Sequence, residues 1–486
     1  MNAPPDTAPA QQATEAKFAT ERDPRLRILI PLVVAFAFLM EQIDSTIITT
    51  AIPQMARDLD TTVLRMNLAV TAYVLTLAVF IPVSGWFADR FGARRIFALA
   101  LLVFTVSSVL CGMAQSFGML VATRALQGLG GAMMTPVGRL ILLRSFPRSQ
   151  LFTAMIYMSL PALMGPVIGP LLGGVLTSYV SWRWIFYINI PFGLVGIALA
   201  LRYVDPFRAE ARVGFDFRGF LMVGAGLALV QFGIENMTRP ILPGPVLALL
   251  MLLAAALLVG FAWHARRTAH PAVDLSLFRF RSFRIGTLIG GLCRIGMNGV
   301  PFLLPVMLQV GFGMSPVRSG SLTFFTSIGA LAIRSISTRL LKGLGFDRVL
   351  LGSAVAGAAT MAGFALIGPE TPAWVIALYV TVFGLIRSAQ FMSSNTLAYA
   401  DMPGEQLSRA TSLGGVMQQL TVSLGVSLGA TLLGLAAGSE HRLTVEGFHQ
   451  TFLLIALIPL IAAPGFLFLH PEDGAKVSGH VRRPVP

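Results

Sequence analysis

Two carboxylates lie in the middle of the first long apolar stretch of the chain, residues 32–53. Glu41 and Asp44 are three residues apart, so a helix places them on one face, about one turn apart. Two carboxylates so close together in a poor dielectric cannot both ionise cheaply. We therefore predict that the pair accepts and releases a proton. For Glu41 the alternative is a helix-packing hydrogen bond or a shallower position, which leaves Asp44 alone in this role.

Arg124 falls inside another apolar stretch. A guanidinium does not lose its proton in a protein, and when buried it needs acceptors. Glu41 and Asp44 are the in-membrane carboxylates that the first half of the chain offers it. We therefore expect Arg124 to pair with one of these acids and to be released when that acid is protonated. The alternative is a static arginine that is hydrogen-bonded to main-chain carbonyls.

The composition shows what kind of element carries these charges. The 486 residues are 55% hydrophobic and only 12% charged, with a mean hydropathy of +0.75, which is too apolar for a soluble globular protein. Because a bilayer core of about 30 Å needs about 20 helical residues, we predict an all-α polytopic membrane protein with fourteen transmembrane helices. The predicted spans are 28–50, 66–87, 96–114, 117–139, 151–176, 184–203, 217–235, 244–264, 285–311, 319–341, 349–368, 373–399, 410–437 and 449–470.

Basic residues predict the orientation of these spans. Most arginines and lysines of the connecting segments fall on the side of the N-terminus, which places both termini in the cytoplasm. The net charge of +14 is then a topology signal with some attraction to anionic lipid headgroups, and it does not indicate nucleic acid. A polar segment precedes the first span, unlike a signal peptide, so we expect that span to be retained.

The pattern of polar connections predicts two halves with an insertion. Spans 217–235 and 244–264 carry almost no charge and no patterned glycine, which is typical of an inserted hairpin. Small residues repeat every four positions in the fifth span and again at Gly425 and Gly429 in its counterpart, which predicts close helix packing and internal symmetry. The predicted parts are a cytoplasmic tail 1–27, a six-helix bundle 28–204, a linker with two inserted helices 205–284, a six-helix bundle 285–470 and a cytoplasmic tail 471–486.

Several phrases occur together and in order. They are DSTIITTAIP at 44–53, GWFADRFGARR at 85–95, RALQGLGG at 124–131, GPVIGPLLGG at 165–174 and WRWIFYINIPFG at 182–193. Together they resemble the major facilitator superfamily, and more narrowly its fourteen-span drug:proton antiporter family, with 131–140 and 294–301 most similar to the MdtD-like branch. The resemblance implies proton-coupled efflux of drugs or other small molecules by alternating access, in a bacterial inner membrane. It implies no cofactor besides the proton gradient, and it assigns Arg124 to proton coupling through the first-span acid.

The resemblance also implies roles for two glycine-containing motifs. The first is a cytoplasmic latch between the halves, formed by Gly85, Asp89, Arg90, Gly92, Arg94 and Arg95, where we expect the glycines to permit a tight turn. A purely topological basic loop is the alternative, although it does not explain Asp89. In the second half Lys342 stands in place of Asp89, which argues against a second latch. The second is an antiporter motif associated with export, formed by Gly165, Pro166, Gly169, Pro170, Gly173 and Gly174.

Polar residues within the other spans predict a substrate cavity. The candidates are Gln127, Arg294, Asn298, Gln309, Arg387, Gln390 and Asn395. Each could instead hold two helices together by hydrogen bonds. Because the second half has intramembrane arginines without a matching carboxylate, export of anionic carboxylate metabolites is the alternative to multidrug export.

Other classes of protein have less support in the sequence. Both cysteines lie in apolar stretches and the histidines lie near span ends, so neither a disulfide nor a metal site is expected. We find no cluster of nucleophile and base that would indicate an enzyme, and no loop large enough for a sensor domain. A periplasmic adaptor protein is a candidate partner for which the sequence shows no feature.

Overall fold

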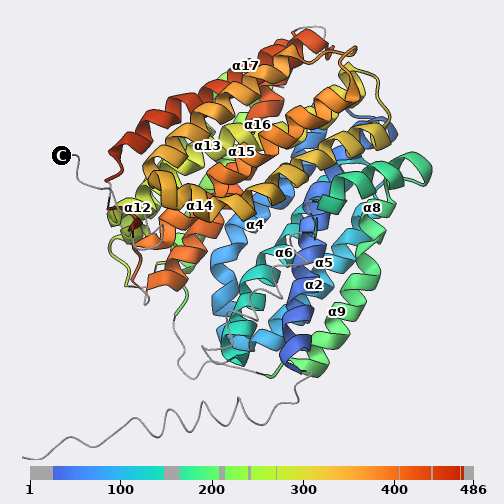
Figure 1. Cartoon of the computed structure of the whole chain (residues 1–486). Coiled ribbons are helices and arrows are strands. Elements are labelled where there is room, and N and C mark those ends of the chain that lie inside the picture. The colour runs from blue at the N-terminus through green and yellow to red at the C-terminus, as the bar shows by residue number, and fades with distance from the viewer. Residues whose placement is uncertain are drawn as a thin grey trace, which may run out of the picture.

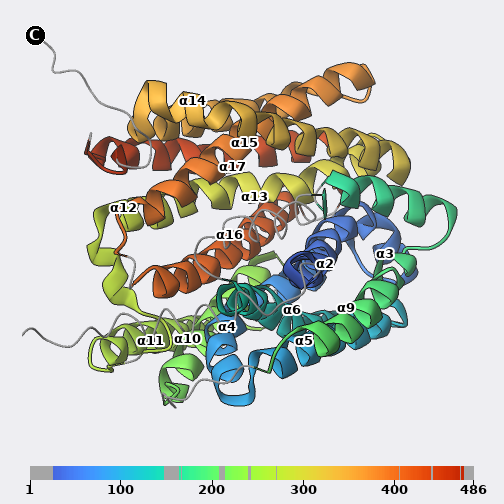
Figure 2. The ribbon, with the colours of Figure 1, turned by 60° about the horizontal axis from the view of Figure 1, so that its bottom comes forward.

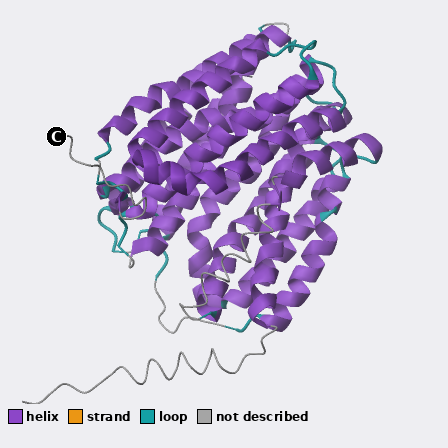
Figure 3. Cartoon of the chain, viewed as in Figure 1, coloured by secondary structure: helices purple, strands orange, loops and turns teal. Residues whose placement is uncertain are grey.

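The chain forms two bundles of helices that lie side by side (Figures 1 and 2). The computed structural model describes residues 26–146, 164–165, 167–206, 214–238, 242–269, 271–403, 406–438, 442–470 and 472–475. Within these ranges the regular structure is helical and no strand occurs (Figure 3). Residues 1–25, 471 and 476–486 of the predicted tails and residues 151–163 of the predicted fifth span lie outside the described residues.

The first bundle contains the helices that carry Asp44 and Arg124. Its elements are α2 (Leu26–Ile47), η1 (Ile48–Thr50), α3 (Ile52–Asp58), α4 (Val63–Phe91), α5 (Ala93–Gly112), α6 (Phe117–Ser145), the helix Val167–Tyr179, α8 (Trp184–Tyr187) and α9 (Asn189–Tyr203). Side chains set several of these starts, since Thr62 caps α4 and Ser116 caps α6 by accepting main-chain N–H groups.

The second bundle follows an inserted pair of helices, α10 (Phe217–Thr238) and α11 (Gly244–Ala265). Its elements are η2 (Leu275–Arg279), α12 (Arg281–Arg284), the π-helix η3 (Ile285–Ile289), α13 (Gly290–Val306), η4 (Met307–Gly311), α14 (Pro316–Gly363), η5 (Phe364–Leu366), α15 (Ala373–Ala400), α16 (Leu407–Ala436), α17 (Val445–Ala462) and η7 (Ala463–Phe468). The long α14 is two helices joined at a kink, because Gly345 has φ 79°.

Eleven helices in the described ranges are long and apolar enough to cross a membrane. The three other predicted spans correspond to α6, to the helix Val167–Tyr179, which is the described part of the predicted fifth span, and to the part of α14 before its kink. Arg124 and a run of glycines lower the hydropathy of α6. In α6 the residues that suggest chemistry are therefore the ones that weaken the membrane-span signal.

Glycines let the helix Val167–Tyr179 and its N-terminal extension lie directly against α2. A Cβ at Gly169 would stand 2.1 Å from the Thr46 hydroxyl, and a Cβ at Gly173 would stand 2.5 Å from the main-chain oxygen of Ile47. The second bundle repeats this arrangement, since a Cβ at Gly425 of α16 would lie 2.5 Å from the main-chain oxygen of Ile295 in α13. The repeated glycines therefore set the helix spacing in both bundles.

The inserted pair lies beside α4 of the first bundle and α16 of the second (Figure 2). Gln231 of α10 accepts a hydrogen bond from Ser423 of α16 at 3.1 Å and donates one to Ser427. The ring of Phe220 in α10 contacts that of Phe80 in α4, with centroids 5.5 Å apart. The insertion thus contacts both bundles, through hydrogen bonds on one side and aromatic rings on the other.

Asp216 links the two ends of the insertion outside the apolar spans. Its carboxylate accepts hydrogen bonds from the Gly219 and Ala272 N–H groups and lies 2.7 Å from His264 Nε2. Partial burial disfavours the charged carboxylate, but these hydrogen bonds outweigh burial and lower the pKa of Asp216. The start of α10 and the end of α11 are therefore held together.

Among the described residues, the main apolar core that the two bundles share lies at the end where α2 stops. There Ile47 and Met55 join Leu303 and Phe383 in one cluster, whereas the clusters around Phe97 and around Leu350 belong almost entirely to one bundle each. At the shared end Gln309 donates a hydrogen bond to the Thr50 carbonyl at 3.0 Å. The bundles therefore share an apolar core at this end, and α4 of the first bundle also packs against α16 of the second.

We predict that widening Gly320 will open this shared end. A Cβ at Gly320 would lie 2.3 Å from the Pro170 carbonyl oxygen, so Gly320→Val must separate the bundles there. We expect severalfold faster maleimide labelling of a Gln309→Cys reporter in the Gly320→Val background. Gly352→Val in the same helix is the matched control, because a Cβ at Gly352 meets no atom within 4 Å. Equal labelling in both backgrounds would show that this contact does not hold the bundles together.

A buried charge cluster as candidate functional site

An ion pair joins α2 to α6 in the interior of the first bundle. The Nη1 of Arg124 lies 2.6 Å from Oδ2 of Asp44, and both side chains are 1% exposed. Burying two charges is costly unless each finds partners, so the surrounding groups decide whether the pair is tolerated. The structure thus brings Arg124 to Asp44, one of its two predicted partners.

Two amides complete the shell of Asp44. Its Oδ1 accepts hydrogen bonds from Gln127 Nε2 at 2.8 Å and from Asn189 Nδ2 at 3.2 Å. Gln127 lies one turn beyond Arg124 on α6, and its Oε1 accepts from Arg124 Nη1 at 2.6 Å. Both carboxylate oxygens are therefore engaged, and Gln127 bridges the two charges.

Arg124 also contacts α4. Its Nε donates to the Ala69 carbonyl at 3.2 Å, and its guanidinium lies 4.3 Å from the centroid of the Tyr73 ring. Arg124 Nη2 and the Tyr73 hydroxyl have no hydrogen-bond partner in the described part of the chain. The arginine therefore uses both kinds of acceptor that the sequence suggests, a carboxylate and a main-chain carbonyl. Its Nη2 group can still donate a hydrogen bond.

Glu41 lies apart from this cluster. It is 7% exposed, and its Oε2 accepts a hydrogen bond from Thr135 of α6 at 2.6 Å. Among the described residues, no ion pair or hydrogen bond joins Glu41 to Arg124 or to Asp44. This hydrogen bond joins α2 to α6, and of the two acids Asp44 is the one that contacts Arg124 in the described part of the chain.

Sequence reasoning missed Asn189. It begins α9, and its amide donates both to Asp44 and to Ser108 Oγ, the latter at 2.9 Å. Ser108 in turn donates to the Phe186 carbonyl at 2.9 Å. The signal was the position of Asn189 inside the apolar phrase 182–193, since asparagines in membrane spans commonly form hydrogen bonds between helices.

The second bundle contains two arginine–asparagine pairs. Arg294 Nη1 donates to Asn395 Oδ1 at 3.1 Å, and Arg387 Nη2 donates to Asn298 Oδ1 at 3.0 Å. No carboxylate of the described chain lies within 4.0 Å of either guanidinium. Arg294 Nε and Asn298 Nδ2 are buried without a partner in the same ranges. These four residues form a cationic, donor-rich group between α13 and α15.

The seven predicted cavity residues therefore do not form one contact network. Gln127 belongs to the Asp44 cluster, Arg294, Asn298, Arg387 and Asn395 form the arginine–asparagine group, and Gln309 lies at the shared core. Gln390 contacts Ser353 and Ser394, with a 3.5 Å hydrogen bond to the latter, which is a helix-packing role.

The two glycines of the predicted latch differ. Gly92 ends α4 with φ 95°, as a tight turn requires. For Gly85 the prediction of a turn is wrong, because Gly85 lies inside α4 and a Cβ there meets no atom within 4 Å.

The second half has the same glycine geometry at Gly345, which aligns with Gly92. Gly92, Arg94 and Arg95 line a small cavity of about 250 Å³, and Arg90 lies 5.6 Å from the Trp86 ring.

In the antiporter motif Gly165, Gly169 and Gly173 face α2, whereas Gly174 and Pro170 face α14 of the other bundle. A Cβ at Gly174 would lie 2.6 Å from the Pro316 carbonyl oxygen. Pro166 lies outside the described residues. The motif thus occupies a junction between the bundles.

Comparison with known proteins identifies the class. The profile of the Major Facilitator Superfamily matches residues 34–426, and the chain belongs to this superfamily of transporters. The fold is similar to that of the D-xylose-proton symporter, with a TM-score of 0.65 at 14% identity over 92% of this chain and 98% of that one. It is also similar to the nucleoside transporter NupG, with a TM-score of 0.64 at 14% identity over 91% and 99%.

Full-length relatives narrow the class. The chain is 39% identical to "Putative multidrug resistance protein MdtD" of Klebsiella pneumoniae (strain 342), over 93% of this chain and 96% of the relative. It is 39% identical to the protein of the same name in Cronobacter sakazakii (strain ATCC BAA-894), with the same coverage. The protein is thus an all-helical, multi-pass membrane transporter with multidrug resistance homologues, and it is not an enzyme.

We predict that the ion pair makes stability respond unequally to its two charges. Asp44→Asn leaves a guanidinium that cannot be neutralised, so it should lower the free energy of unfolding by about 3–5 kcal/mol at every pH tested. Arg124→Gln leaves a carboxylate that can take up a proton, so its destabilisation should shrink as the pH falls. Thermal unfolding of the purified variants between pH 5 and 8 measures this. A pH-independent loss in Arg124→Gln would contradict the pairing.

Proposed function

We propose that the protein is a proton-coupled antiporter that exports drugs or other small molecules by alternating access, with fourteen spans and both termini in the cytoplasm of a bacterium. The eleven apolar helices, together with α6, the helix Val167–Tyr179 and the first part of α14, account for that count. The excess of arginine and lysine on the N-terminal side of the membrane supports the orientation and a place in the inner membrane.

The observation that carries the proposal is the buried pair of Asp44 and Arg124. Protonation of Asp44 removes its negative charge, so its hold on Arg124 weakens and Gln127 remains as the neighbouring acceptor of the guanidinium. Asn189 and Gln127 donate hydrogen bonds to Asp44 Oδ1, and therefore hold the carboxylate beside Arg124. Glu41 is a second proton acceptor, held separately by Thr135.

The proton gradient is large enough to drive this cycle without another cofactor. One charge moving inward gains about 2.3 kcal/mol per 100 mV of membrane potential, and each unit of pH difference adds about 1.4 kcal/mol. A change in the protonation of Asp44 alters the ion pair that joins α2 to α6, and both helices belong to the first bundle. Movement of that bundle against the other then exposes the site to the opposite side.

The arrangement of cores fits one state of this cycle. In the proposed orientation the shared core, with Gln309 on Thr50, lies on the periplasmic side. The bundle-specific cores lie toward the cytoplasm, where Gly92 and the latch arginines are. The latch is then a contact that forms when the bundles close on the cytoplasmic side. The antiporter motif at 165–174 supports export, because it lies where the bundles must separate for outward release.

The transport prediction concerns Asp44. In inverted membrane vesicles we expect Asp44→Asn to abolish accumulation of a lipophilic cation that is driven by a pH gradient, while substrate-for-substrate exchange without a gradient continues. Glu41→Gln should reduce the driven rate less, because Glu41 does not contact Arg124. Glu446→Gln, at the exposed start of α17, is the control and should leave transport unchanged. Proton-driven accumulation that survives Asp44→Asn would refute the coupling role.

The arginine–asparagine group favours a second candidate cargo, an organic anion such as a carboxylate. Arg294 and Arg387 offer guanidinium donors that no carboxylate of the described chain neutralises. The names of the relatives support drugs, whereas these charges support anions.

A matched assay separates the two cargoes. If anions are carried, Arg294→Gln and Arg387→Gln should each reduce export of di- and tricarboxylates at least about tenfold, the effect of losing one charged hydrogen bond of about 1.4 kcal/mol. Export of a lipophilic cation should stay the same or increase. Arg318→Gln, at the exposed start of α14, is the control and should leave both exports unchanged. Unchanged carboxylate export in both arginine variants would remove the anion site.

A further inference from the structure

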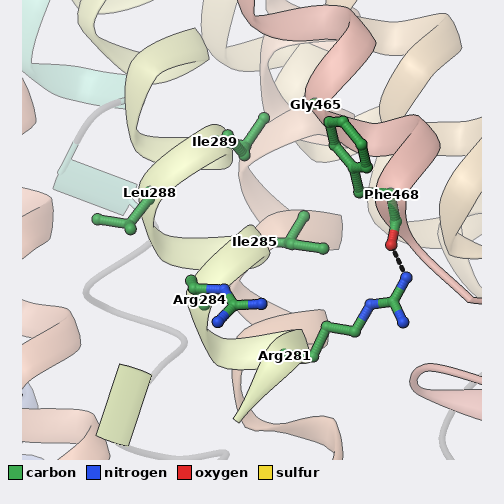
Figure 4. A pocket seen from close by; sticks show the side chains of 7 residues that line it. All are labelled: Arg281, Arg284, Ile285, Leu288, Ile289, Gly465 and Phe468. Atoms are coloured by element: carbon green, nitrogen blue, oxygen red, sulfur yellow. Dashed lines mark hydrogen bonds between the residues drawn. The ribbon is translucent and has the colours of Figure 1, made fainter. Parts of the chain in front are cut away.

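An open groove of about 420 Å³ lies on the second bundle, whereas Asp44 belongs to the first (Figure 4). One wall comes from α12 and η3, with Arg281 and Arg284 at its polar end and Leu288 farther along. The other wall comes from η7, with Gly465 and Phe468. The groove therefore combines cationic and apolar surfaces in one place.

Two irregular helices shape this groove. Residues 285–289 form a π-helix and residues 463–468 form a 3₁₀-helix. A Cβ at Gly465 would lie only 2.8 Å from the Ile289 side chain, so a larger residue would displace Ile289 where the two walls meet. Single π-turns within helices often mark functional sites, because the extra residue changes the direction of neighbouring side chains.

The polar end of the groove has an uncommitted positive charge. Arg281 is fixed by its Nε, 3.3 Å from Asp473 Oδ2, and by a hydrogen bond from Nη2 to the Phe468 carbonyl. Its Nη1 stays available, since a guanidinium has five N–H donors. Arg284 is exposed and makes no hydrogen bond or ion pair with any residue in the described ranges. An anion placed here meets two guanidinium groups and only one carboxylate.

The apolar part of the groove faces away from the bundle interior. Leu288 and Leu292 follow Arg284 at four-residue intervals and are 42% and 38% exposed. On the opposite side of the same helical segment, Gly286 and Gly290 are packed against Ser394 of α15. Phe468 on the other wall is 72% exposed. In a membrane-embedded bundle such outward apolar side chains face acyl chains.

We propose that this groove binds one anionic phospholipid. The headgroup phosphate accepts hydrogen bonds from Arg284 and from Nη1 of Arg281, and an acyl chain lies along Leu288 and Leu292 toward the middle of the bilayer. Charge complementarity selects a lipid with a net negative headgroup. The apolar wall selects a lipid over a free phosphate, because a soluble anion gains nothing from it. The site is independent of the coupling role of Asp44.

Native mass spectrometry of the detergent-purified full-length protein tests the site. The probes are phosphatidylglycerol, phosphatidylcholine with the same acyl chains, and glycerol phosphate. We expect one retained phosphatidylglycerol on the wild-type protein, about tenfold weaker binding in Arg284→Gln, and intermediate binding in Arg284→Lys. Leu288→Ser should also weaken phosphatidylglycerol binding, because the acyl chain loses its contact surface.

Arg279→Gln is the matched control. Arg279 precedes the groove by a few residues, does not line it and lies over its neighbour Phe280. It should bind phosphatidylglycerol as the wild type does. Equal loss in Arg279→Gln and Arg284→Gln would show attraction to surface charge rather than a site, and equal retention of phosphatidylcholine would remove the selectivity for anionic lipid. Glycerol phosphate binding as tightly as the lipid would show a soluble-anion site. Each of these results overturns the proposal.

Discussion

A permanent cation inside an apolar bundle is the constraint on which the first half of this protein depends. Arg124 cannot become neutral, so the fold must supply it with a carboxylate and with acceptors around it. Three helices supply direct acceptors for Arg124, namely Asp44 on α2, Gln127 on α6 and the Ala69 carbonyl on α4. A fourth helix, α9, contributes Asn189, which donates a hydrogen bond to Asp44. These helices cannot be repacked independently, because each carries part of one hydrogen-bonded unit.

The same logic explains the position of the glycines. α2 must lie close enough to α6 for a 2.6 Å ion pair. The helix Val167–Tyr179 also packs closely against α2, through Gly169 and Gly173. Close packing by small residues fixes α2 without using polar groups, which leaves the carboxylate free to respond to its partners. In the second bundle Gly425 brings α16 against α13 in the same way, but the charged residues there are arginines held by asparagines.

The sequence alone was sufficient to predict the helical class, most helix positions and the contact of Arg124 with an acid. Helix positions follow from the hydropathy of neighbouring residues, and the contact follows from the need of one buried charge for an opposite one. The sequence was not sufficient to choose between Glu41 and Asp44. Both acids face α6, so the choice depends on how α2 is aligned along α6, which places Asp44 at the level of Arg124 and Glu41 at the level of Thr135. Asn189 escaped because an amide carries no charge to be balanced. The role of Gly85 was misjudged because a glycine in a motif does not reveal whether its backbone or its lack of side chain matters.

The inserted helices change how the bilayer meets the two junctions between the bundles. α10 contacts both α4 and α16, so lipid tails reach that junction only past α10 and α11. At the other junction, the helix Val167–Tyr179 meets α14 through Gly174 and Gly320. An apolar molecule dissolved in the membrane therefore meets two different junctions between the bundles. One is covered by the inserted helices, and at the other the bundles touch through main-chain atoms and glycines.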